Sequence, residues 1–76
     1  MNNNEIEIIP VEDARIGDIL KRRVQACYTL HSSIFEEWEH GKPVKMWRDE
    51  FGILCIAYED GKWWHYSFKS TGIEWW

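Results

Sequence analysis

The chain has 76 residues, which suits one compact domain and leaves no room for a second. Its 45% hydrophobic and 16% aromatic content, with six tryptophans, excludes a disordered protein and can supply a dense core. The formal net charge of -4 argues against binding nucleic acid mainly through phosphate contacts. We therefore predict a single domain over residues 1–76, with residues 1–4 disordered.

The first predicted element is a short strand. Residues 5–9 begin with an alternation of polar and β-branched residues and stop at Pro10. Because proline cannot donate a hydrogen bond to a neighbouring strand, it is tolerated at a sheet edge. We expect residues 5–9 to form an edge strand that precedes the helical part of the domain.

The segment from about residue 12 to residue 40 has a helical period. Its apolar residues, spaced three or four apart, are Ile16, Leu20, Val24, Cys27, Leu30, Ile34 and Trp38. Gly41 and Pro43 supply a stop. One straight helix of this length would extend roughly 40 Å, and a capping box begins at Ser33. We predict one bent helix or two consecutive helices that break near Ser33; at Gly17, a turn into a strand is the alternative.

After Pro43 the pattern changes to β-branched and aromatic residues with a period of two. Three strands are predicted, at residues 44–48, 53–59 and 62–68. Asp60-Gly61 indicates a two-residue hairpin turn between the last two strands. The predicted fold is therefore α+β: a short N-terminal strand, the helical layer, and a three-stranded antiparallel meander packed on that layer. The C-terminal residues add at most a short piece that folds back.

A two-residue turn at Asp60-Gly61 would fix which residues of the two strands lie opposite each other. Successive side chains of a strand point to opposite faces of the sheet, and directly opposed residues point to the same face. One face then carries Ile53, Cys55, Ala57, Trp64, Tyr66 and Phe68. The other face carries Leu54, Ile56, Tyr58, Trp63 and His65. If Asp49–Gly52 is a four-residue loop, Val44 and Met46 join the first face and Lys45 and Trp47 join the second. Antiparallel sheets usually have one polar face, whereas both faces here are apolar. We expect the first face to pack on the helices.

The second face has the aromatic anchors and mixed rim that are typical of protein interfaces. We predict a protein-interaction module without catalytic activity, whose partner is another protein or a second copy in a homodimer. The predicted partner-binding residues are Trp47, Leu54, Ile56, Tyr58, Trp63 and His65. Two alternatives stay open for this face: the N-terminal strand or the Trp75-Trp76 tail covers it, or it is a platform for a small ligand or a sugar.

Two alternative functions compete with this prediction. The first is an acidic inhibitor or regulator, of the type carried by phages and mobile elements. Its acidic surface would consist of Glu36, Glu37, Glu39, Asp49 and Glu50. The second is a nucleic-acid-binding protein that uses the basic run Lys21–Arg23. The simpler interpretation of that run is a solvated helix face.

The sequence predicts no catalytic, metal or cofactor site. Cys27, His31, Cys55 and His65 formally make a zinc ligand set, but the closely spaced ligand pairs of small zinc domains are absent. Cys27 also belongs to the apolar helical stripe. No phosphate loop or nucleophile motif is present. We expect neither enzyme activity nor a bound metal or cofactor.

The location is predicted from the N-terminus and the cysteines. Residues 1–5 have no signal-peptide pattern, and no apolar run approaches the roughly 20 residues that span a bilayer. Cys27 and Cys55 are the only cysteines, and in a reducing cytosol they would be free, packed thiols. We expect a cytoplasmic protein without membrane association.

Overall fold

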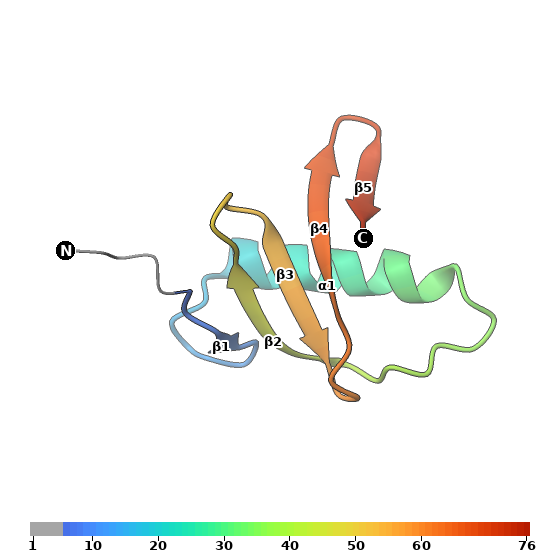
Figure 1. The fold of residues 1–76 in the computed structure, drawn as a ribbon, viewed down its shortest axis with the longest axis horizontal. Coiled ribbons are helices and arrows are strands. Elements are labelled where there is room, and N and C mark those ends of the chain that lie inside the picture. The colour runs from blue at the N-terminus through green and yellow to red at the C-terminus, as the bar shows by residue number, and fades with distance from the viewer. Residues whose placement is uncertain (1–5) are drawn as a thin grey trace.

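The computed structural model describes residues 6–76, so the predicted disorder of residues 1–4 lies outside the described residues. It contains one α-helix and a five-stranded antiparallel sheet in the order β1-β2-β3-β4-β5. The elements are β1 (Ile9–Pro10), α1 (Asp18–Ser33), β2 (Pro43–Arg48), β3 (Leu54–Tyr58), β4 (Trp63–Lys69) and β5 (Gly72–Trp75). Figure 1 shows α1 crossing one face of the sheet.

The prediction of a three-stranded meander with two helices, or one long bent helix, is wrong, although an α+β domain remains. The N-terminal strand adds to the sheet by pairing Ile9 with Met46 and Pro10 with Lys45, and it is only two residues long. The C-terminal residues form a full fifth strand on β4. Both ends of the chain therefore extend the sheet that the central meander begins.

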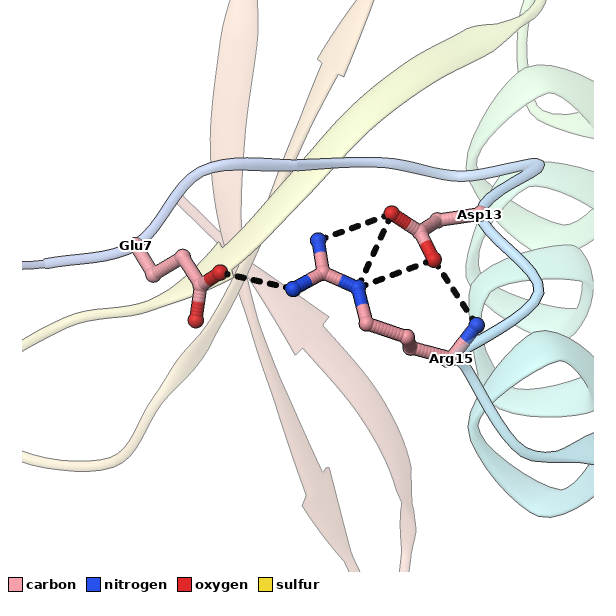
Figure 2. Close-up of polar contacts among 3 residues, drawn as sticks. All are labelled: Glu7, Asp13 and Arg15. Carbon is pink, nitrogen blue, oxygen red and sulfur yellow. Dashed lines mark hydrogen bonds and ion pairs between the residues drawn. The ribbon is translucent and has the colours of Figure 1, made fainter.

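The helix begins at Asp18, and not near residue 12, because the residues before it form turns. The Asp13 backbone N–H donates to the Pro10 carbonyl at 3.0 Å. The Asp13 carboxylate accepts hydrogen bonds from the Arg15 backbone N–H at 2.8 Å and from the Arg15 guanidinium, which also reaches Glu7 at 3.3 Å (Figure 2). An aspartate that bonds the backbone two residues further on offers the chain an alternative to the helix.

The helix ends at Ser33, and no second helix follows it within the described part of the chain. The Ser33 hydroxyl donates to the Leu30 carbonyl at 2.7 Å, so it is turned back onto the last turn of α1 and does not cap a new helix. Residues 34–42 form an irregular connection, in which the Trp38 indole N–H donates to the Gly41 carbonyl at 2.6 Å. The predicted break near Ser33 is therefore the end of the helix.

The core lies between α1 and the sheet. From the helical side it contains Ile16, Val24, Cys27 and His31, and from the sheet Met46, Leu54, Ile56, Tyr58 and Tyr66. The apolar stripe predicted for the helix faces the core as far as Cys27. Beyond that point His31 takes the buried position, whereas Leu30 is exposed. The helix therefore brings a polar aromatic side chain into an otherwise apolar core.

The hairpin between β3 and β4 has a three-residue loop, so the predicted register is wrong by one residue. The Tyr58 N–H donates to the Lys62 carbonyl, and the Gly61 N–H donates to the Tyr58 carbonyl, both at 2.9 Å. Gly61 has φ +89°, the left-handed conformation that a three-residue hairpin loop requires at one position. Ala57 consequently lies opposite Trp63, and not opposite Trp64.

A register shift of one residue exchanges the two faces of β3, because side chains alternate along a strand. β4 presents Trp64 and Tyr66 towards α1, in agreement with the predicted face. β3 presents its large residues to α1, and leaves Cys55 and Ala57 on the other face. The face of the sheet away from α1 therefore differs from the predicted one in its central strand.

Candidate binding surface on the outer sheet face

The face of the sheet that points away from α1 is called the outer face. Its composition follows from the strand pairing: Trp47 lies opposite Cys55, Cys55 opposite His65, and Ala57 opposite Trp63. The outer face carries Lys45, Trp47, Cys55, Ala57, Trp63, His65, Ser67, Glu74 and Trp76. This set is enriched in aromatic rings, and its smallest side chains lie on the central strand.

Four rings form a continuous line on the outer face, here called the aromatic row. The centroids of Trp47 and Trp63 lie 5.1 Å apart, those of Trp63 and His65 5.0 Å, and those of His65 and Trp76 5.0 Å. These separations are typical of interacting aromatic pairs. Trp63 is 47% exposed and Trp76 is 54% exposed, so the row offers rings to the solvent.

The small residues of β3 allow the aromatic row to form. Trp47 lies on β2 and Trp63 on β4, so their rings must meet across β3, over a distance of two strand spacings or roughly 9–10 Å. Cys55 and Ala57 leave that space free because their side chains are short. The hairpin loop at Gly61 is what places these two residues, and not Leu54 or Ile56, under the rings.

Three side chains with metal-binding atoms lie close together at one end of this face: Asp49, Cys55 and His65. One Asp49 oxygen, Oδ1, accepts the backbone N–H groups of Phe51 and Ile53 at 2.8 and 2.9 Å. The other oxygen, Oδ2, lies 3.9 Å from His65 Nε2. Cys55 is buried, and burial together with the negative charge of Asp49 raises the pKa of its thiol to about 11.

On the opposite side of the sheet, His31 joins two tyrosines in a buried network. His31 Nδ1 lies 2.6 Å from the Tyr66 hydroxyl, which lies 2.7 Å from the Tyr58 hydroxyl. Burial, and to a smaller extent the nearby His40, lowers the pKa of His31 to about 4, and burial raises the pKa of Tyr58 to about 12. The network is therefore neutral at physiological pH. It connects the helix to the sheet and is closed to ligands.

The structure divides the predicted partner-binding residues between the two faces. Trp47, Trp63 and His65 lie together in the aromatic row. Leu54, Ile56 and Tyr58 are 3%, 0% and 1% exposed and pack in the core, so they do not belong to the surface. The reason is the one-residue register shift of β3. Trp76 was not among the predicted residues, yet it pairs with His65 and completes the row.

The predicted acidic surface is not continuous. Glu36, Glu37 and Glu39 are exposed in the connection that follows the end of α1. Asp49 and Glu50 lie in the loop between β2 and β3, which Figure 1 places at the opposite end, near the start of α1. Asp49 is moreover turned inwards by its hydrogen bonds. The structure does not bring these five carboxylates together.

The basic run Lys21–Arg23 is also spread out. Successive helix residues point about 100° apart. Lys21 lines a hollow beside Val11, Arg22 lines a hollow beside Leu30, and the Arg23 guanidinium lies 5.2 Å from the centroid of the Phe68 ring. The three cations therefore face three different parts of the surface.

The formal Cys2His2 set considered from the sequence is separated by the sheet, with Cys27 and His31 in the core and Cys55 and His65 on the outer face. Within residues 6–76, no helix has the length and apolar character needed to cross a bilayer. Comparisons with protein-family models, curated proteins and solved structures gave no significant match. The functional proposal therefore rests on the geometry of the outer face.

Proposed function

We propose that this protein is a non-catalytic, cytoplasmic interaction module that binds another protein through its outer sheet face. The observation that carries the proposal is the aromatic row, in which Trp63 and Trp76 are about half exposed. Among residues 6–76 no helix or strand packs over this face, since α1 lies on the other side. Tryptophan is, with tyrosine and arginine, enriched among the residues that dominate the affinity of protein interfaces.

The charges around the aromatic row indicate the chemistry of the partner. Within the described residues, no carboxylate lies within ion-pair distance of Lys45, which is exposed on this face. Glu74, which lies on β5 at the other side of this face, pairs with Lys69 at 3.6 Å, and Asp49 is turned towards His65. Among residues 6–76, the outer face therefore offers apolar rings beside a lysine that has no carboxylate partner. A fitting partner presents apolar side chains next to a carboxylate.

The cytoplasmic part of the proposal is supported by the two cysteines. Cys27 and Cys55 are both free and buried, on opposite sides of the sheet. Buried free thiols are usual in proteins that work under reducing conditions.

The proposal predicts that Trp63→Lys abolishes partner binding and leaves the fold intact, because Trp63 is exposed at the centre of the row. A suitable measurement is affinity capture from host lysate, with the retained protein identified and its binding then measured with purified components. Ile19→Lys is the matched control: it also replaces an exposed apolar residue by lysine, but on α1, where Ile19 is 72% exposed.

The expected result is a partner retained by the wild type and by Ile19→Lys but lost by Trp63→Lys. Equal retention by all three proteins would refute a role for the outer face. Unfolding of Trp63→Lys would show that the face is part of the core. Sedimentation at several protein concentrations tests self-association: a wild-type dimer that dissociates in Trp63→Lys would assign the face to a second copy of this chain.

A further inference from the structure

We propose that Asp49, Cys55 and His65 form a binding site for a divalent transition-metal ion of the Zn²⁺ class. This inference does not rest on the proposed protein interaction, although the site lies on the same face. A carboxylate oxygen, a cysteine sulfur and an imidazole nitrogen are all ligands that Zn²⁺ accepts. The thiolate and the carboxylate together balance the charge of the ion, and His65 coordinates as the neutral imidazole.

The three donor atoms already converge. One ligand atom from each side chain lies within 4.8 Å of the other two, and the Asp49 Oδ2 to His65 Nε2 distance is 3.9 Å. Around a tetrahedral zinc ion, neighbouring ligand atoms lie roughly 3.3–3.7 Å apart. The site therefore needs a closure of at most roughly 1–1.5 Å, which side-chain rotations can provide. Cys55 and His65 are directly opposed on β3 and β4, so the sheet fixes their separation.

The surrounding hydrogen bonds leave the coordinating atoms of His65 and Asp49 free, and the Cys55 thiol makes only a 3.7 Å contact with the Ile53 carbonyl, which metal binding would replace. The Trp76 carbonyl lies 3.2 Å from His65 Nδ1 and can only accept, so a neutral His65 ring donates from Nδ1 and presents the lone pair of Nε2 to the site. Metal-binding histidines commonly donate their other N–H to a carbonyl in this way. In Asp49, Oδ1 is occupied by the backbone N–H groups of Phe51 and Ile53, and Oδ2 points to the site.

The contact geometry of this cluster differs from that of the second histidine–aspartate pair, His40 and Asp60. His40 Nδ1 and Asp60 Oδ2 lie 2.6 Å apart, which is a direct hydrogen bond that uses both groups. At 3.9 Å, His65 and Asp49 are too far apart for such a bond and too close to be independent. Cys55 adds a sulfur beside them, whereas the thiol of Cys27 lies in the core on the other side of the sheet.

Binding changes the protonation of Cys55. The sulfur–metal bond forms as the S–H proton leaves to solvent, and no electron is transferred, so the step needs only the metal ion and water. Three protein ligands leave a fourth coordination position, which water can occupy.

The test uses the metal alone. Co²⁺, a spectroscopic substitute for Zn²⁺, is titrated into the purified metal-free protein under reducing conditions. The expected result is one ion per chain, with a thiolate-to-cobalt charge-transfer band that Zn²⁺ abolishes by competition. Cys55→Ala should lose the band, and Asp49→Asn should weaken binding at least tenfold. Asp49→Asn keeps an oxygen for the two backbone N–H groups, so this variant should fold.

Two matched variants are the controls. Cys27→Ala removes the other buried thiol, and His40→Gln disrupts the other histidine–aspartate pair. Both should bind Co²⁺ as the wild type does. Absence of the band in the wild type, its persistence in Cys55→Ala, or unchanged affinity in Asp49→Asn would overturn the proposal. None of these outcomes depends on a protein partner, so the metal site and the interaction can fail separately.

Discussion

His31 is the buried polar residue of the core, at 1% exposure. Its ring contacts those of Trp38, Trp64, Tyr66 and Trp75, and its Nδ1 bonds the Tyr66 hydroxyl at 2.6 Å. A charged imidazole at this position would lose its hydration without gaining a counter-ion, which is why burial lowers the pKa of His31 to about 4.

The depressed pKa predicts an acid-sensitive fold. The neutral form is favoured in the folded state, whereas the unfolded state takes up a proton below about pH 6.5, so stability is lost as the pH falls from 6.5 towards 4. The maximum loss from His31 is roughly 3 kcal/mol, at 1.36 kcal/mol for each unit of pKa difference. Urea denaturation between pH 7 and pH 4 measures it. His31→Gln should show a shallower pH dependence, and an unchanged slope would contradict this assignment.

At the scale of the elements, the loop between β3 and β4 decides which face of β3 meets the helix. Gly61, at φ +89°, allows a three-residue loop, in which Ala57 pairs with Trp63. A residue with a Cβ in the left-handed region costs about 1–2 kcal/mol, and asparagine tolerates this region better than alanine does.

We therefore expect Gly61→Ala to destabilise the protein by about 1–2 kcal/mol and Gly61→Asn to cost clearly less. Thermal or urea unfolding of the three proteins gives the difference. Contacts between Ala57 and Trp63 measured by NMR report whether the register is kept. Equal losses for alanine and asparagine would show that the backbone conformation at Gly61 is not the cause.

Some elements of the fold could be predicted from the sequence, and others could not. The apolar period identified α1 as far as Cys27, since burial and spacing agree there. The end of the stripe was predicted wrongly because His31, a polar residue, satisfies its nitrogen on Tyr66 and so can be buried. The hydrogen-bond partner, Tyr66, lies on β4, 35 residues further along the chain. The local spacing of apolar residues cannot reveal a partner at that distance.

The register of β3 could not be read from turn chemistry, because Asp60-Gly61 fits both a two-residue and a three-residue loop. The size of the side chains was the signal that could have decided it. Leu54, Ile56 and Tyr58 bury far more apolar area against a helix than Cys55 and Ala57 do. Half of the predicted site, Trp47, Trp63 and His65, lies on the outer face, since β2 and β4 have the alternation assumed for them.

At the scale of the whole molecule, the charges do not form the surfaces that two of the predicted functions require. The carboxylates are divided between the two ends of α1, and the cations of the basic run face three directions. The concentrated feature is the aromatic row, with Lys45 beside it.

This distribution predicts that partner binding depends weakly on ionic strength. Burial of aromatic rings is little screened by salt, and a single ion pair at Lys45 should change the affinity only a few-fold between low and high salt. Calorimetric titration with the purified partner at several salt concentrations measures this. A steep loss of affinity with salt would favour the acidic surface or, for a nucleic-acid ligand, the basic run.

The fixed geometry of Trp47 and Trp63 also has an optical consequence. Their rings lie 5.1 Å apart at an interplanar angle of 57°, so the electronic transitions of the two indoles couple as a chiral pair. Such a pair contributes an exciton signal to the far-ultraviolet circular dichroism, superimposed on that of the backbone. Trp63→Lys would remove this signal and so change the far-ultraviolet spectrum of a protein that is still folded. The integrity of that variant is therefore better judged from its amide proton NMR spectrum than from circular dichroism.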